Sequence, residues 1–236
     1  IIGRLVGSEM CIRDSLNDIS NVGLPAGTEF LDLISPQYIS DLVSWGAIGA
    51  RTAESQVHRE LTSGLSCPVG IKNSTNGEYK PAIDAIKSAK YQHVFLGATK
   101  QGKVAIFKTS GNDDTHLILR GGKNPNYDKD SVHACIKSLS ESNINSNIMV
   151  DFSHGNSQKN HENQAKVCSS ICSQIANGNK NIVGVMIESN LQAGNQKISN
   201  QMEYGKSITD ACVDFEETKV FLENLSTAVQ KRREIG

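Results

Sequence analysis

Short apolar runs alternate with polar turns and helical patterns along the chain from Leu16 onward. We predict strands at 27–32, 47–51, 68–72, 94–97, 148–152 and 181–188, where apolar residues are contiguous over strand length. Between them, we predict helices at 36–45, 53–61, 79–89, 131–141, 160–176 and 215–233, and a loop at 190–201. Strands and helices that alternate at this spacing indicate βα units on a parallel sheet.

One interruption occurs between the fourth of these strands and the fifth. The segments 103–107 and 116–120 are both apolar, and they flank the turn-rich stretch Gly111-Asn-Asp-Asp114. We interpret them as a hairpin that is inserted before Gly121-Gly122.

Polar or charged residues stand at or beside the carboxyl ends of the predicted strands: Arg51, Lys72, Asp151 and Glu188. Ligands bind at that end of the strands in a (β/α)₈ barrel. Six barrel-type strands lie near residues 28, 48, 70, 95, 149 and 185, whereas a closed barrel has eight. The predicted fold is therefore α/β, a TIM barrel that lacks its first two strands. A doubly wound open sheet is the alternative, although no glycine-rich phosphate loop follows an early strand.

Residues 1–15, IIGRLVGSEMCIRDS, differ from the rest of the chain. They have neither strand alternation nor a helical period that continues past Ser15, and residues 4–15 match the conceptual translation of a transposase sequencing adaptor. We interpret 1–15 as a non-native leader and 16–236 as a partial TIM-barrel catalytic domain, with the missing strands before Leu16. A natural, variable N-terminus is the alternative.

Composition and charge argue against nucleic acid and membrane as partners. The net charge of −1 leaves no basic footprint for nucleic acid, and no apolar run approaches the length of a membrane span. The six cysteines are dispersed without a CxxC pair. Cys168 and Cys172 stand one helical turn apart, but buried thiols are favoured over a metal site there. We expect a reduced, cytoplasmic protein.

Three cations end predicted strands: Arg51, Lys72 and Arg120. Arginine binds carboxylate or phosphate through two parallel hydrogen bonds, and lysine acts as a point charge. Together they suit a small substrate that carries both a phosphate and a carboxylate. A salt bridge or a solvated surface charge is the alternative for each of them.

A second group consists of His154, Glu188 and Asp210. His154 follows the strand at 148–152, Glu188 ends the strand at 181–188, and Asp210 lies in a loop after it. An imidazole and two carboxylates suit one divalent metal such as Mn, Fe, Co or Zn. A structural, hydrogen-bonded histidine is the alternative.

Seven motifs resemble the type I 3-deoxy-D-arabino-heptulosonate 7-phosphate (DAHP) synthases, a family sensitive to phenylalanine, tyrosine or tryptophan. The resemblance runs from about Leu16 to Arg233, and the motifs that carry it are SWGAIGART, ESQVHRELTSGLSCPVGIKN, LILRGG, PNYDKDSV, DFSHGNS, VGVMIESN and YGKSITDAC. The resemblance implies condensation of phosphoenolpyruvate with erythrose 4-phosphate to DAHP and phosphate, the first step of the shikimate pathway. It also implies a homo-oligomer, a dimer or tetramer, when the chain is full length.

The resemblance assigns roles to residues as well. It implies phosphoenolpyruvate binding by Ala50, Arg51, Lys72 and Arg120, with Lys72, Arg51 and His154 as catalytic residues. It implies a metal held by His154, Glu188 and Asp210, and an aromatic amino acid effector bound by Gln37, Leu61, Ser66 and Phe95. Ordinary helix and strand packing is the alternative for these last four.

Two family motifs are absent from this sequence: Gly-Pro-Cys, which supplies a fourth metal ligand, and Lys-Pro-Arg-Thr, which binds erythrose 4-phosphate. We therefore expect the fragment itself to be inactive. A related phosphoenolpyruvate-dependent sugar-acid synthase and a non-catalytic, barrel-derived regulatory protein are the alternative functions.

Overall fold

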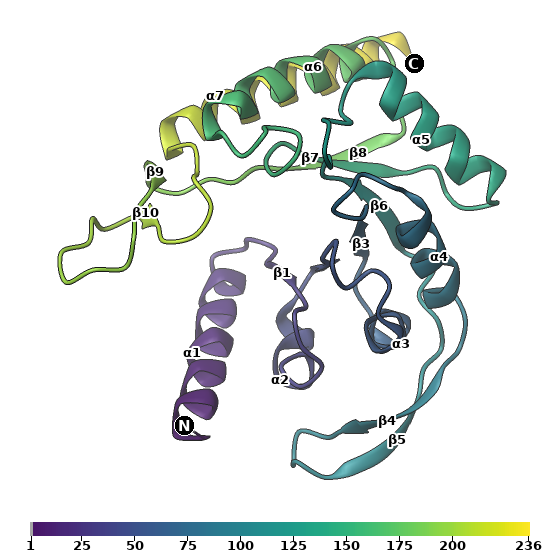
Figure 1. Cartoon of the computed structure of the whole chain (residues 1–236), viewed down its shortest axis with the longest axis vertical. Coiled ribbons are helices and arrows are strands. Elements are labelled where there is room, and N and C mark those ends of the chain that lie inside the picture. Colours follow the sequence, from purple (N-terminus) through teal and green to yellow (C-terminus); the bar gives the residue numbers. More distant parts are fainter. Residues whose placement is uncertain (1) are drawn as a thin grey trace. The chain divides into compact units, whose positions relative to one another are not determined.

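The chain folds into strands and helices that alternate along two units (Figure 1). The computed structural model describes residues 2–236, with side chains from Cys11 onward. The first unit comprises Ile1–Ser74 and Lys80–Leu117, and the second comprises Thr75–Tyr79 and Ile118–Gly236.

Three parallel strands begin the sheet of the first unit: β1 (Gly27–Glu29), β2 (Trp45–Ile48) and β3 (Val69–Lys72). All four residues of β3 are buried. A run of buried residues without alternation is typical of a parallel strand that is covered on both faces. These three strands are close to their predicted positions.

The helices of the first unit are α1 (Ile2–Asn21), α2 (Pro36–Ile39), the 3₁₀ helix η1 (Ser40–Leu42), α3 (Gln56–Gly64) and α4 (Lys80–Ala89). The helix predicted at 36–45 ends at Leu42, because β2 already begins at Trp45. In α4, the apolar face from Ala82 to Ile86 is buried, as its spacing predicts.

An antiparallel hairpin of β4 (Val94–Ala98) and β5 (Val104–Lys108) also belongs to the first unit (Figure 1). Exposed and half-buried residues alternate along β5 and along β4 up to its last residue, which is the pattern of a ribbon with one face in water. The prediction that 94–97 is a barrel strand is therefore wrong. The predicted pairing of 103–107 with 116–120 is wrong as well, because 104–108 pairs with 94–98 instead.

The strand β6 (Thr115–Leu119) holds the place in the parallel sheet that the prediction gave to 94–97. All five of its residues are buried, and the strand order of the sheet is β1-β2-β3-β6-β7-β8. The boundary between the units falls inside β6, after Leu117. The predicted number of six strands and the α/β class are thus confirmed, although one member of the set differs.

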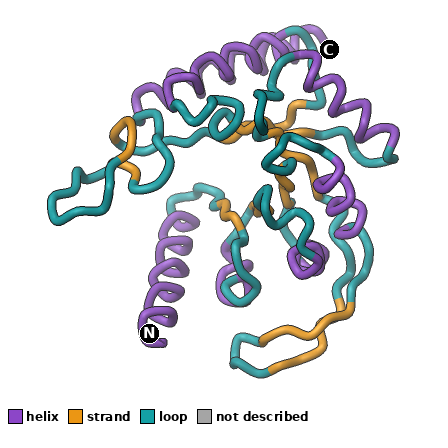
Figure 2. Tube along the Cα trace, viewed as in Figure 1, coloured by secondary structure: helices purple, strands orange, loops and turns teal. Residues whose placement is uncertain are grey.

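The second unit adds β7 (Ile148–Asp151) and β8 (Ile182–Met186), which pair in parallel. Its helices are α5 (Lys129–Glu141), the 3₁₀ helix η2 (His161–Asn163), α6 (Gln164–Ala176) and α7 (Phe215–Ile235). Figure 2 shows α6 and α7 as long neighbouring helices. The predicted loop at 190–201 contains β9 (Gln192–Asn195), which pairs with β10 (Lys206–Ser207).

The predicted leader is helical in this structure. Helix α1 runs without a break from Ile2 to Asn21, so the chain continues as one helix past Ser15. The guanidinium of Arg13 donates two hydrogen bonds of 2.7 Å to the Asp41 carboxylate, and Leu16 is buried. The origin of residues 1–15 stays a prediction.

The helices of residues 2–236 include none with the length and apolarity that crossing a membrane requires.

Candidate active site

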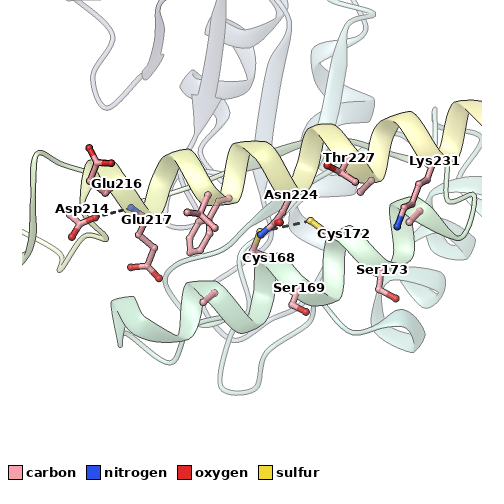
Figure 3. Close-up of a pocket in the computed structure, with 15 residues that line it drawn as sticks. Cys168, Ser169, Cys172, Ser173, Asp214, Glu216, Glu217, Asn224, Thr227 and Lys231 are labelled. Atoms are coloured by element: carbon pink, nitrogen blue, oxygen red, sulfur yellow. Dashed lines mark hydrogen bonds between the residues drawn. The ribbon is translucent and has the colours of Figure 1, made fainter.

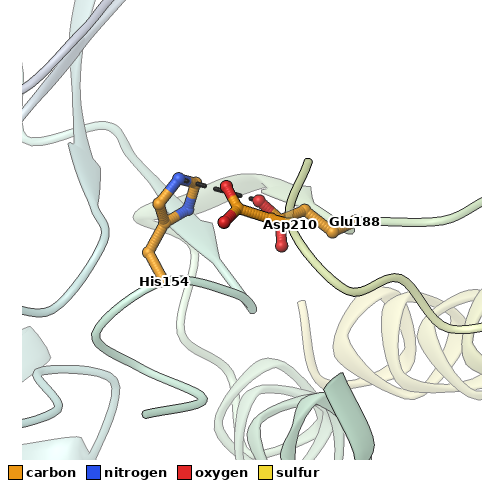
Figure 4. A group of neighbouring side chains, drawn as sticks. All are labelled: His154, Glu188 and Asp210. Carbon is orange, nitrogen blue, oxygen red and sulfur yellow. Dashed lines mark ion pairs between the residues drawn. The ribbon is translucent and has the colours of Figure 1, made fainter. Parts of the chain in front are cut away.

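Three predicted metal ligands come together in the second unit (Figure 4). His154 lies in the turn after β7, Glu188 lies two residues beyond β8, and Asp210 lies in the loop before α7. Each offers one ligand atom, and these atoms lie within 4.8 Å of one another. An ion pair joins His154 Nε2 and Glu188 Oε1 at 3.6 Å.

The imidazole of His154 is oriented from its other nitrogen. Its Nδ1 lies 2.9 Å from Asp151 Oδ2 and 2.8 Å from Ser153 Oγ. Asp151 is only 1% exposed, and its Oδ1 accepts hydrogen bonds from the backbone and side chain of Ser153. A carboxylate on Nδ1 directs Nε2 outward, as is usual for a histidine that binds a metal.

The backbone at His154 is unusual for a residue with a side chain, because its φ is 53°. Hydrogen bonds hold the turn on both sides. The Gly155 N–H donates to the carbonyl of Arg120 at 3.0 Å, and the Lys159 N–H donates to the carbonyl of His154 at 2.9 Å. Strain of this kind often marks a functional turn.

Negative charge accumulates around Glu188. Burial is the largest cause that raises the pKa of its carboxyl, and the neighbouring carboxylates of Asp151 and Asp210 raise it further, against the opposing effect of His154. A divalent cation would relieve this repulsion. The donor set of one imidazole nitrogen and two carboxylates fits Mn, Fe, Co or Zn.

The predicted cations are distributed over both units. In the first unit, Lys72 ends β3, is 5% exposed, and places its Nζ 3.2 Å from Oε2 of Glu29, the last residue of β1. Ala50 is half-buried and Arg51 is exposed, in the turn after β2. Sequence reasoning missed Glu29, although a charge at the end of the first strand was a signal for it.

Arg120 belongs to the second unit and directly follows β6. Since its carbonyl accepts the Gly155 N–H, its backbone is bonded to the residue that follows His154. The loop after it runs close to other backbone, because a Cβ on Gly122 would lie 2.4 Å from the Gly77 nitrogen. Gly121 and Gly122 have no side chains, which permits this close approach.

Two asparagines that sequence reasoning missed hold this loop to the strand ends. Asn156 donates from Nδ2 to the carbonyls of Leu119 (3.1 Å) and Asp151 (2.8 Å). Its Oδ1 accepts from Asn126 N, and Asn126 Oδ1 accepts from Gly121 N. The ends of β6 and β7 are therefore connected through side-chain amides.

Three of the four predicted effector residues line one cavity of about 400 Å³ in the first unit. They are Gln37, Leu61 and Phe95. Ser66 is not part of that lining.

A larger groove of about 910 Å³ lies between α6 and α7 (Figure 3). It contains none of the predicted site residues. Cys168 and Cys172 line it, with their Sγ atoms 3.8 Å apart, and burial raises the pKa of the Cys168 thiol to about 12. A thiol with a pKa that high is protonated and unreactive at neutral pH. Cys168 is buried, in agreement with the interpretation as a buried helical thiol, whereas Cys172 is only half-buried.

Comparison with known proteins identifies close relatives. The sequence pattern of the DAHP synthetase I family matches residues 6–223. The Phe-sensitive phospho-2-dehydro-3-deoxyheptonate aldolase of Escherichia coli (strain K12) is 55% identical over 94% of this chain and 64% of its own length. The Trp-sensitive enzyme of the same strain is 50% identical over 93% of this chain and 64% of its own length.

A solved structure agrees with these sequence relatives. The phospho-2-dehydro-3-deoxyheptonate aldolase from Francisella tularensis SCHU S4 superposes with a TM-score of 0.91 at 57% identity, over 93% of this chain and 65% of that one. The chain thus spans a little under two thirds of the length of the proteins that it resembles.

Proposed function

Since the chain belongs to the DAHP synthetase I family, we propose that it serves the condensation of phosphoenolpyruvate with erythrose 4-phosphate to DAHP and phosphate. This is the first step of aromatic amino acid biosynthesis through the shikimate pathway. The observation that carries the proposal is the group of His154, Glu188 and Asp210, whose ligand atoms lie within 4.8 Å of one another. The backbone of Arg120 is bonded to the same turn.

We assign phosphoenolpyruvate binding to Ala50, Arg51, Lys72 and Arg120. The donor carries a phosphate and a carboxylate, and guanidinium groups bind both in a fixed geometry. Lys72 is buried beside the Glu29 carboxylate, so its ammonium is held at the end of β3. Exclusion of water from such a site lowers the local dielectric constant and so strengthens each interaction between charges.

The chemistry divides between the chain and a metal ion. The side chains of His154, Glu188 and Asp210 would hold one Mn, Fe, Co or Zn ion, which would supply Lewis acidity toward the aldehyde oxygen of erythrose 4-phosphate. Asp151 keeps His154 oriented through Nδ1. Arg51 and Lys72 orient the donor and stabilise the charge that develops as the carbon–carbon bond forms and water expels phosphate.

Regulation is the finer part of the proposal. The named relatives are Phe-sensitive and Trp-sensitive, and a cavity of about 400 Å³ brings Gln37, Leu61 and Phe95 together. We assign this cavity to an aromatic amino acid effector, with Ser66 as a further contact. A cytoplasmic homo-oligomer, a dimer or tetramer at full length, completes the proposal.

Titration calorimetry of phosphoenolpyruvate and Mn²⁺ into the chain tests the binding assignments. Arg51→Ala should weaken phosphoenolpyruvate binding about tenfold or more, as removal of a charge-assisted contact does. Lys90→Ala is the matched control, since Lys90 is an exposed cation of the same unit that pairs with Asp113. Equal affinities in both variants would contradict the Arg51 assignment.

Product analysis tests the reaction itself. The chain is incubated with phosphoenolpyruvate, Mn²⁺ and a panel of aldose phosphates, and both DAHP and free phosphate are measured. A product from another aldose phosphate would favour the related sugar-acid synthase. Absence of binding for both phosphoenolpyruvate and metal would favour the non-catalytic alternative, and robust DAHP formation would refute the expectation of an inactive fragment.

A further inference from the structure

The predicted metal ligand Glu188 lies beyond the region where β7 and β8 pair. Their register ends at Asp151↔Met186, and the Phe152 N–H still donates to the Met186 carbonyl at 2.9 Å. After Phe152 the chain turns into the segment that carries His154. The strand β7 therefore stops short of the position at which it would pair with Glu188.

The side-chain amide of Gln164 occupies that position. Its Oε1 accepts from the Glu188 N–H at 3.0 Å, and its Nε2 donates to the Glu188 carbonyl at 3.0 Å. A primary amide presents a donor and an acceptor side by side. One side chain thus satisfies both backbone groups of Glu188, as a residue of a neighbouring strand would.

Gln164 is well fixed for this role. It is the first residue of α6 and its exposed fraction is 0%. Asn163, just before it, donates from Nδ2 to the Ser157 carbonyl at 3.0 Å. The amide is thus anchored both by the helix and by the turn that follows His154.

A second segment holds Glu188 from another direction. The Val213 N–H donates to the Glu188 carbonyl at 3.0 Å, and the Asn190 N–H donates to the Val213 carbonyl at 3.0 Å. Val213 lies three residues after the metal ligand Asp210, and Gln164 lies ten residues after the metal ligand His154. The backbone of one metal ligand is therefore bonded to the two segments that carry the others.

We propose that Gln164 is a positioning residue for the metal site: its amide fixes the backbone of Glu188 so that the carboxylate stays close to His154 and Asp210. Glu188 requires such a fixed backbone because the carboxylates of Asp151, Glu188 and Asp210 repel one another in the absence of a cation. Metal affinity depends on ligands that are held in place beforehand. This inference rests on the proposed function, since it assumes that the three ligands bind a metal.

The experiment compares two glutamines of the same helix. Gln164→Met removes both hydrogen bonds to Glu188 while it keeps a side chain of similar length. Gln174→Met is the matched control. Gln174 is also buried on α6 and donates to a backbone carbonyl, that of Tyr127, at 2.8 Å, but it lies ten residues further along the helix, about 15 Å away.

Two measurements are made on the wild-type chain and both variants: the Kd for Mn²⁺ by titration calorimetry, and the exchange rate of the Glu188 amide by NMR without metal. Gln164→Met should raise the Kd about tenfold or more, the usual effect of removing a partner that orients a metal ligand. It should also speed exchange of the Glu188 amide. Gln174→Met should leave both close to wild type.

Each other outcome counts against the proposal in a distinct way. Equal Kd values for Gln164→Met and Gln174→Met would overturn the role of Gln164 and leave the metal site intact. Failure of the wild-type chain to bind Mn²⁺ would overturn the metal site and this inference together, while the exchange data would still show whether Gln164 holds Glu188.

A second variant is available if Gln164→Met does not fold. Gln164→Glu keeps an acceptor for the Glu188 N–H and, when ionised, loses the donor to the carbonyl. Its Glu188 amide should stay protected while its Kd for Mn²⁺ rises. An unchanged Kd in this variant would also overturn the proposal.

Discussion

Protonation of His116 should destabilise the first unit as the pH falls from about 6.5 to about 4. His116 is buried in β6, with 9% of its surface exposed, and its Nε2 accepts a hydrogen bond from Trp45 Nε1 at 3.1 Å. An acceptor nitrogen must be unprotonated. Burial lowers the pKa of the imidazole from 6.5 to about 4, so the folded state keeps it neutral.

The sign of the effect follows from proton binding. Above pH 6.5 the histidine is neutral in the folded and unfolded states, and the stability is fully present. As the pH falls below 6.5, the unfolded chain binds a proton that the folded chain does not, and the free energy of unfolding decreases. The loss levels off near pH 4 and amounts to about 3 kcal/mol, at about 1.4 kcal/mol for each pH unit.

Trp45 is the sole tryptophan of the chain and belongs to the first unit, so its fluorescence reports unfolding there. Urea unfolding is followed for the wild-type chain and for His116→Gln from pH 7.5 to pH 4. A glutamine side chain can still accept from Trp45 but does not titrate. Between these limits the wild type should lose about 3 kcal/mol more than the variant, because the contributions of other groups cancel in the difference. Parallel stability curves would refute the reasoning.

Three further substitutions have expected outcomes. Asn112→Leu should lower the free energy of unfolding by about 2–4 kcal/mol in urea titrations, because a buried amide that donates to three carbonyls is lost; an unchanged midpoint would contradict this. Asp151→Asn should weaken Mn²⁺ binding about tenfold or more in calorimetry, since a neutral amide orients His154 less well; unaltered binding would refute it. Gly122→Ala should lower the melting temperature in calorimetric scans, because its Cβ would lie 2.4 Å from the Gly77 nitrogen and backbone cannot move aside as a flexible side chain can; a melting temperature equal to that of the wild type would show that the loop has room.

Elements with a clear period were predictable from the sequence. The spacing of Ala82, Ile83, Ala85 and Ile86 located α4 and its buried face, because a helix that packs on a core shows its period directly. Strand ends were predictable from contiguous apolar runs. The apolar run before Lys72 placed that cation at the end of β3, and similar runs placed His154 and Glu188 just after β7 and β8.

The prediction placed β4 in the parallel sheet at the position that β6 occupies, which shows where the pattern of apolar residues was insufficient. Both are apolar runs of strand length, and only their burial separates them: β4 alternates, whereas β6 is buried throughout. Short apolar runs carry no information about their partners. Partner choice depends on the turn Thr99–Lys103, where the Thr99 N–H donates to the Lys103 carbonyl at 2.8 Å, and this turn was not recognised in the sequence.

The supports of the candidate site were missed for a different reason, which bears on how such sites are built. Asn126, Asn156 and Gln164 are at most 6% exposed, and each bonds to backbone atoms beside a strand end. Buried amides are uncommon in proteins, and burying one is costly unless it is hydrogen-bonded. Beyond the strand ends the backbone ladder stops, so these side chains replace it. Their positions depend on the path of the turns in space, which no local period in the sequence records, whereas the ligands that they support follow the strands.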